Sequence, residues 1–257
     1  MKKYLYFAKY YFKNLVSNKF AYITEFISYA AYILVITQLF SYIFKDKVIE
    51  GFTVKDLMWY VIIGELILKG FHYSCRIIGN DITNGNIAYN LSKPYNFMKR
   101  IIAEHLTTII TVAIITIFSI PLGLIVAGKI EINAVGILLS VLVTLLGLFV
   151  LLLINLIVGI SALWVGKDIS SIWLIVSKMM LVFVFTPIDF LPKTLQSIVK
   201  ILPTTHVTYT PSQLFVHFSY SNFIQSLGYE IYSIILLLIV CVIMYKKGVK
   251  KLNVNSI

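Results

Sequence analysis

The chain has 257 residues, of which 59% are hydrophobic and only 13% are charged, and its formal net charge at pH 7 is +11. A soluble domain carries roughly a quarter charged residues, so this composition excludes an ordinary water-soluble fold and indicates an integral membrane protein. The positive charge does not indicate a nucleic-acid partner, because the cations lie at the ends of apolar runs and no nucleic-acid-binding motif accompanies them.

Residues 1–19 precede the first apolar run and predict an amphipathic helix that lies on the membrane surface. Lys2, Lys9 and Lys13 fall on one face of this helix. The opposite, apolar face comprises Leu5, Ala8, Phe12, Leu15 and Val16. The simpler alternative is a short basic segment that only orients the first span. Both alternatives place residues 1–19 on the cytoplasmic side.

Six apolar runs approach the length that crosses a bilayer. Lipid offers the backbone no hydrogen-bond partner, so each span is expected to be a helix. The predicted spans are Phe20–Phe44, Leu57–Tyr73, Ile101–Ala127, Ala134–Val165, Ile169–Thr186 and Leu227–Tyr245. We therefore expect an all-α integral membrane protein with six transmembrane helices in a single domain, residues 1–257.

The distribution of lysine and arginine predicts the side of the membrane on which each loop lies. With the N-terminus in the cytoplasm, fourteen cations fall on the inner side and six on the outer side, an asymmetry typical of this orientation. We predict a multi-pass protein of the inner (cytoplasmic) membrane with both termini in the cytoplasm. The same topology places the acidic residue Glu230 on the outer side.

The segment between the fifth and sixth runs, residues 187–226, is too polar to span and too apolar to be a free loop. It contains Pro187, Pro192, Pro203 and Pro211. Irregular backbone at the membrane edge must be covered by protein or border a cavity. We expect a re-entrant outer segment with a short helix over Thr194–Leu202.

Four charged residues, Glu25, Glu65, Lys69 and Lys178, fall inside apolar runs. Ionised side chains at such depth usually face the bundle interior or water. Glu25 and Lys69 lie near the predicted cytoplasmic ends, and Glu65 and Lys69 are four residues apart, so these two can pair on one helix face. Lys178 lies near the middle of the fifth run. It either pairs with Glu65 or a backbone carbonyl, or it lines a pathway for an anionic substrate.

Residues 80–94 form a polar stretch between the second and third runs, on the predicted cytoplasmic side. Asn80 or Asp81 is suited to cap a short helix, and Pro94 is suited to stop it. The apolar residues of this stretch, of the kind that fill a groove in a partner protein, are Ile82, Ile87 and Leu91. The alternative is an ordinary solvated loop with an accidental pattern.

The order of these parts resembles the type 2 ABC permease family, the membrane subunits of ABC exporters. The resemblance covers essentially the full length. It consists of the Lys-rich N-terminal helix, two spans, a cytoplasmic stretch, four more spans, and a semi-polar outer segment before the last span. The motifs of the cytoplasmic stretch are Gly85-Asn86-Ile87 and Leu91-Ser92-Lys93-Pro94.

The resemblance implies a permease subunit that pairs with a second permease, identical or different, and with two copies of a cytoplasmic ABC ATPase subunit. It implies a short coupling helix, within about Asn80–Leu91, that docks into a groove of the ATPase. It implies no cofactor and no ATPase site in this chain, and residues 123–130 lack the Ser or Thr of a phosphate-binding loop. We expect ATP-driven export of an amphiphile, such as a lipid-linked molecule or a hydrophobic peptide.

Two other classes of protein remain open alternatives. An ion-coupled secondary carrier uses carboxylates near the membrane midplane and broken spans in matching halves, but here the halves do not match and Glu65 is the only deep carboxylate found in the sequence. A membrane-embedded enzyme needs a clustered acid, base or metal group near one face. The cytoplasmic stretch offers only Asp81 and Glu104, which are far apart in the sequence.

Overall fold

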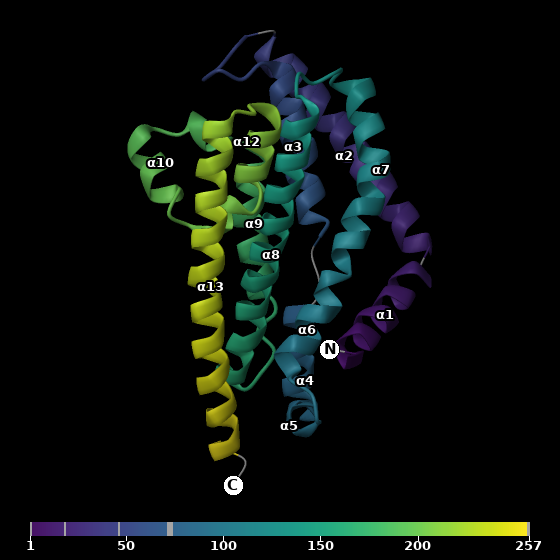
Figure 1. Cartoon of the computed structure of the whole chain (residues 1–257), viewed down its shortest axis with the longest axis vertical. Coiled ribbons are helices and arrows are strands. Elements are labelled where there is room, and N and C mark those ends of the chain that lie inside the picture. Colours follow the sequence, from purple (N-terminus) through teal and green to yellow (C-terminus); the bar gives the residue numbers. More distant parts are fainter. Residues whose placement is uncertain (1, 18, 46, 71–73, 256–257) are drawn as a thin grey trace.

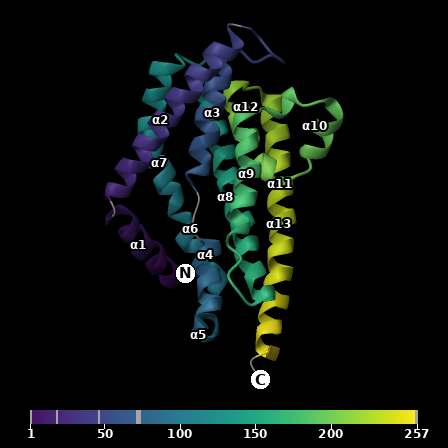
Figure 2. The ribbon, with the colours of Figure 1, turned by 180° about the vertical axis from the view of Figure 1, so that it is seen from behind.

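The computed structural model describes residues 2–17, 19–45, 47–70 and 74–255. All regular secondary structure in these ranges is helical, apart from one isolated β-bridge, which confirms the expected all-α fold for the described residues. Long helices run beside one another along one axis, and both termini lie toward the same end as the short helix α5 (Figures 1 and 2). This end is named the α5 end, and the opposite end, where α10 and α12 lie, is named the α12 end.

Four helical stretches are long and apolar enough to cross a membrane. Their helices are α2 (Lys19–Phe44), α6 (Phe97–Leu106) with α7 (Thr108–Val126), α8 (Ala134–Val165) and α13 (Tyr220–Asn255). The bounds of α8 are those predicted from the sequence, whereas α13 begins well before Leu227. With 32 residues, α8 is about 48 Å long, so it must tilt in the roughly 30 Å hydrocarbon core or extend beyond it.

Two shorter apolar helices, α3 (Val54–Leu68) and α9 (Ile172–Phe185), lie among the long ones, and α3 forms the centre of the bundle. In the central helix, α3, residues 57–64 are all buried. The Tyr60 hydroxyl of α3 donates a hydrogen bond to the Phe183 carbonyl of α9 at 2.6 Å. The end of the predicted second span, residues 71–73, lies outside the described residues.

Local sequence explains where several of these helices begin and end. Thr53 and Asp56 form a reciprocal capping box at the start of α3. The Asn133 side chain accepts a hydrogen bond from the Gly136 N–H at 2.6 Å and caps α8. Gly166 ends α8 in the left-handed conformation, with φ of 76°. The long apolar run of α8 is thus bounded by a polar cap and a glycine.

The expected re-entrant segment folds into short helices at the α12 end. They are η1 (Ile188–Phe190), α10 (Lys193–Val199), α11 (Pro203–His206) and α12 (Tyr209–Val216). The helix α10 corresponds to the short helix predicted from the sequence, and Pro203 begins the next helix. The helix α12 is mostly buried and contacts α3, α8 and α13, whereas α10 contains no buried residue. Part of this segment is therefore inserted among the long helices.

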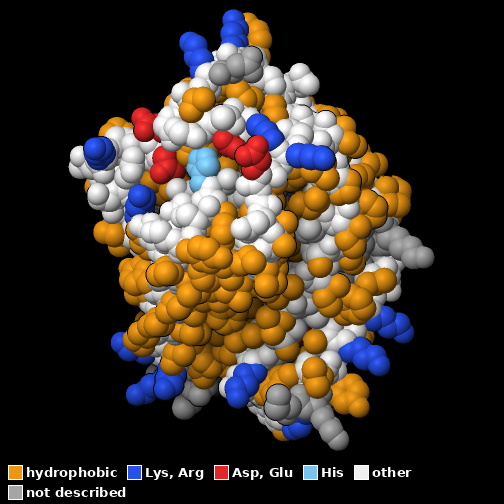
Figure 3. Space-filling model, turned by 45° about the horizontal axis from the view of Figure 1, so that its top comes forward, with side chains coloured by type: hydrophobic (Ala, Val, Ile, Leu, Met, Phe, Trp, Pro, Cys, Tyr) orange, Lys and Arg blue, Asp and Glu red, His pale blue; other side chains and the backbone are white. Residues whose placement is uncertain are grey.

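The surface of the molecule has an apolar region between two polar ends. On the face shown in Figure 3, hydrophobic side chains cover the middle, Lys and Arg border the lower end, and acidic, basic and histidine side chains share the upper end. Large exposed apolar side chains on the long helices include Ile117, Ile125, Leu138, Ile224 and Val35. A continuous apolar surface of this kind is suited to contact with lipid.

Candidate functional site

The polar stretch 80–94 folds mainly into two short helices at the α5 end. The helix α4 (Ser74–Thr83) is followed by α5 (Asn86–Ser92), and between them Gly85 adopts a left-handed φ of 73° that favours glycine. The Asn90 side chain donates a hydrogen bond to the Asp81 carboxylate at 2.8 Å and fastens α5 to α4. Asn80 and Asp81 lie inside α4 and cap no helix, because α4 begins at Ser74 and Gly85 precedes α5.

The helix α4 packs closely along α8. A Cβ atom at Gly159 of α8 would lie 2.8 Å from Cδ1 of Ile78 and 3.0 Å from Cα of Cys75, so only glycine fits without a shift. The Asn155 side chain, fully buried on α8, accepts a hydrogen bond from the Cys75 backbone N–H at 3.0 Å. This bond satisfies an N–H group in the first turn of α4, which has no partner within its own helix. A close contact and a buried hydrogen bond therefore attach α4 to α8.

The loop after α8 is also attached to α4. The backbone N–H of Asp168 donates a hydrogen bond to the Thr83 hydroxyl at 3.0 Å. The Asp168 carboxylate lies where a side chain at position 79 would be, and it accepts a hydrogen bond from the Ser170 N–H at 2.8 Å. Gly79 thus makes room for the contact that holds this loop against α4.

The structure places the apolar residues of the predicted coupling helix inside the chain's own core. Ile82 and Ile87 are buried in a cluster formed with α6 and α8, and Leu91 packs partly buried at the edge of that cluster. Asn80 and Pro94 are exposed. In this conformation the three apolar side chains link α4 and α5 to α8, and other side chains of α5 face outward.

Tyr89 is the large exposed side chain of α5, and sequence reasoning did not single it out. It is 67% exposed. The Lys93 ammonium lies 4.1 Å from the centroid of its ring, within the range of a cation–π contact. Ala88 and Asn86 are exposed beside it. The sequence did contain a signal for this exposure. Tyr89 is two residues from both Ile87 and Leu91, and on a helix this spacing turns Tyr89 away from the face that Ile87 and Leu91 share.

The N-terminal helix α1 (Lys2–Ser17) is attached to the same region. The Lys3 ammonium donates a hydrogen bond to the Pro94 carbonyl at 3.0 Å. The Asn96 N–H donates one to the Tyr4 hydroxyl, also at 3.0 Å. The helix expected to lie on the membrane surface therefore also contacts the start of α6.

Only part of the expected apolar face of α1 is turned toward the protein. Ala8 and Phe12 are half-buried, whereas Leu5 and Val16 are exposed. The side chain of Leu15 lies outside what the structure describes. The exposed apolar side chains leave α1 able to contact lipid as well as the protein.

Lys69 lies between two carboxylates near the α5 end of α2 and α3. Its ammonium is 2.7 Å from Oε1 of Glu25 and 3.5 Å from Oε1 of Glu65. The second oxygen of Glu65 is buried, and no described residue donates a hydrogen bond to it. The pair expected from the four-residue spacing is present, and Glu25 joins it. Lys178 is exposed on α9, and none of the described residues forms an ion pair with it.

Two comparisons bear on the function of this arrangement. A family model described as ABC-2 family transporter protein matches residues 26–256. The search of curated proteins found no match. The family match covers every described helix except α1 and the first residues of α2.

Proposed function

The chain belongs to the ABC-2 transporter family, and we propose that it is the permease subunit of an ATP-driven exporter whose ATPase subunits bind at the α5 end. The observation that carries this proposal is the pair α4–α5, in which a short helix with an exposed tyrosine is fastened to a long apolar helix. Two copies of an ABC ATPase subunit would bind on the cytoplasmic side. A second permease subunit, identical or different, would complete the transport pathway.

The proposed topology has six membrane crossings, formed by α2, α3, α6–α7, α8, α9 and α13. Successive crossings run in opposite directions between the α5 end and the α12 end. The α5 end faces the cytoplasm in this topology, because the excess of Lys and Arg is found there. The protein is then a subunit of the inner membrane with both termini in the cytoplasm. Residues 187–226 form the re-entrant segment on the outer side.

The proposed mechanism transmits force from the ATPase to α8 through contacts within this chain. Closure of the ATPase pushes on the exposed face of α5. The Asp81–Asn90 hydrogen bond passes this force to α4, and the contacts at Asn155 and Gly159 pass it to α8. Because α8 packs extensively against α13, its displacement changes the packing of the bundle. Ile82 and Ile87 act in this mechanism as buried links between the helices.

Replacing Tyr89 with aspartate tests the docking of the ATPase. Aromatic anchors at interface centres often contribute 2 kcal/mol or more, so we expect affinity for the ATPase and permease-stimulated ATP turnover to fall at least about tenfold. Both are measured on the purified complex in lipid nanodiscs. The control is Tyr220→Asp, at a tyrosine 63% exposed at the α12 end. Docking through α5 is refuted if the two variants bind the ATPase as the unchanged protein does.

The exposed position of Lys178 supports an anionic amphiphile as the substrate. Its neighbours Leu174 and Ile175 on α9 are also exposed. An ammonium group that faces lipid at this depth is costly, so we propose that this face of α9 borders the pathway shared with the second permease subunit. There Lys178 would pair with the anionic group of the substrate while the apolar residues contact its chains.

Replacing Lys178 with methionine is expected to abolish transport of an anionic amphiphile while the protein still folds. The measurement is transport of a fluorescent anionic lipid by proteoliposomes that contain the whole complex, with the thermal unfolding midpoint of the subunit as the check on folding. Lys193→Met, at an exposed lysine of α10, is the matched control. Equal transport by both variants contradicts the proposed role.

A further inference from the structure

A carboxyl group lies fully buried inside the bundle without a partner. Glu230 of α13 has no exposed surface, and neither of its carboxyl oxygens accepts a hydrogen bond from a described residue. Its Oε1 lies 3.5 Å from the position of a Cβ atom at Gly147 of α8. The sequence predicts Glu230 on the outer side of the membrane, and the structure adds that the side chain is enclosed where α13, which begins at Tyr220, packs on α8.

The groups around Glu230 supply no compensating charge within the described residues. The helix α8 has no titratable side chain. The helix α11 contributes His206, whose ring stacks on Tyr229 with centroids 4.7 Å apart. The ring nitrogens of His206 bond to the Thr210 hydroxyl and the Lys200 carbonyl, and burial lowers the pKa of His206 below its ordinary value. The imidazole is therefore neutral near pH 7.

The other charged groups nearby form no ion pair with Glu230 among the described residues. Tyr209 of α12 donates a hydrogen bond to the Asp189 carboxylate at 3.1 Å. Lys200 is half-buried and lines a small pocket toward the α12 end.

The surroundings of Glu230 suit a neutral carboxylic acid. Burial of an ionised carboxylate without a partner costs several kcal/mol, and burial of a neutral polar group costs less. The Val207 carbonyl oxygen lies 3.1 Å from the same Cβ position at Gly147, so an acceptor for an acid O–H borders the space that Glu230 occupies. A metal ion would need several fixed ligands, and no cluster of three His, Cys, Asp or Glu residues exists among the described residues.

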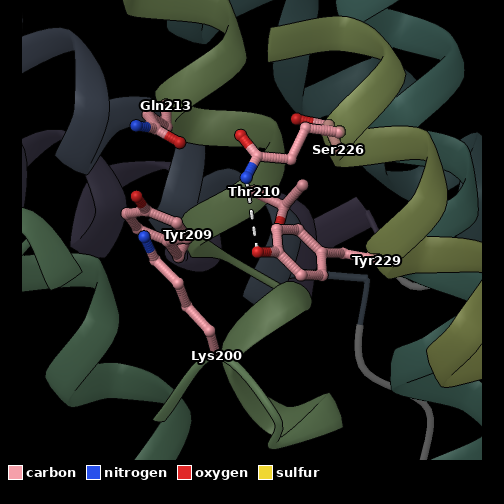
Figure 4. A pocket seen from close by; sticks show the side chains of 7 residues that line it. Lys200, Tyr209, Thr210, Gln213, Ser226 and Tyr229 are labelled. Atoms are coloured by element: carbon pink, nitrogen blue, oxygen red, sulfur yellow. Dashed lines mark hydrogen bonds between the residues drawn. The ribbon is translucent and has the colours of Figure 1, made fainter. Parts of the chain in front are cut away.

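A polar pocket toward the α12 end is lined by residues of α12 and of the first turns of α13 (Figure 4). Ser226 lines this pocket and lies four residues before Glu230, so both are on one face of α13. Ser233 continues this face on the other side of Glu230, and its buried hydroxyl has no partner among the described residues. The other lining residues include Lys200, Tyr209, Thr210, Gln213 and Tyr229. Ser226 is therefore a pocket residue that shares a face of α13 with the buried carboxyl group.

We propose that Glu230 is a proton-binding site that exchanges its proton with water at the α12 end through this pocket. On release the carboxyl O–H bond breaks, the proton passes to a water molecule, and the electron pair stays on the carboxylate. The resulting unpaired charge against α8 favours separation of α8 from α13, and proton binding favours the packed arrangement. This proposal depends on neither the ATPase partner nor the direction of transport.

Infrared spectroscopy of the full chain in lipid nanodiscs at neutral pH tests the protonation of Glu230. We expect a carboxylic-acid C=O band that is lost in Glu230→Gln and kept in Glu131→Gln, which removes an exposed carboxyl group. Glu230→Leu, which places a neutral side chain in the same space, serves if the glutamine variant does not fold. Identical acid bands with and without Glu230 would show that the group is ionised and would overturn the proposal.

Transfer into D2O tests the access route. The C=O band of Glu230 shifts when its proton is replaced by deuterium, and we expect this shift to occur several-fold more slowly in Ser226→Leu, which fills the pocket. The band itself should remain, because Ser226→Leu leaves Glu230 in place. An unchanged exchange rate in a folded Ser226→Leu variant would overturn access through the pocket.

Discussion

Replacing Gly159 with valine is expected to lower the stability of the subunit by about 3 kcal/mol, the upper part of the range for overpacked cores, and to uncouple ATP hydrolysis from transport. The Cβ atom alone would approach Cα of Cys75 to 3.0 Å, and that atom is backbone, so α4 itself must move away from α8. The shift also strains the hydrogen bond between the Cys75 N–H and Asn155. Stability is measured by thermal unfolding of the detergent-purified subunit, and coupling by transport per ATP hydrolysed in proteoliposomes.

The control for this variant is Gly228→Ala in α13, where an added Cβ atom meets nothing within 4 Å. Alanine in a helix is favoured over glycine by about 1 kcal/mol, so we expect this control to be neutral or slightly stabilising. A Gly159→Val protein as stable and as well coupled as the control would show that α4 does not need its close contact with α8.

The second large effect is expected for Lys69→Met, which leaves Glu25 and Glu65 facing each other without a cation. Removing one partner of a buried ion pair costs about 3–5 kcal/mol. The Lys69 and Glu65 side chains retain 20% and 13% exposure, so we expect a loss near the lower limit. Thermal unfolding of the purified subunit measures the change.

The double variant Lys69→Met with Glu65→Gln provides the sharper test of this ion pair. It removes the more buried of the two carboxylates together with the cation, so it should recover a large part of the lost stability. Lys129→Met, at an exposed lysine near the α12 end, should change stability by less than about 0.5 kcal/mol. Failure of the double variant to recover stability would mean that the cost of Lys69→Met does not come from the unpaired Glu65.

Most of the long helices could be predicted from the sequence, because their signals are local. The apolar run of α8 lies between a capping Asn133 and a terminating Gly166, and its bounds were predicted at both ends. The pair Glu65 and Lys69 followed from a four-residue spacing on one helix. The place of the short helices α4 and α5 also followed from local features, since a polar stretch ending in Pro94 interrupts two apolar runs.

The contacts of the candidate site could not be predicted, because they join residues that are distant in the sequence. A short amphipathic helix has the same pattern whether its apolar face meets a partner or its own chain, so Ile82 and Ile87 were interpreted as docking residues although they are buried against α6 and α8. The burial of Glu230 could not be predicted either, because the groups that enclose it, at Gly147 and Val207, are distant in the sequence. The pairing of Asn155 with Cys75 leaves no local signal.

The proposed coupling to the ATPase requires that α5 be exposed on the cytoplasmic side of the membrane. Cysteine labelling of Ala88→Cys tests this position with little background, because both native cysteines, Cys75 and Cys241, are buried. A thiol reagent that cannot cross the membrane should label the introduced cysteine in inverted membrane vesicles and not in intact cells, and bound ATPase should protect it. Labelling in intact cells, with no protection by the ATPase, would contradict the proposed coupling surface.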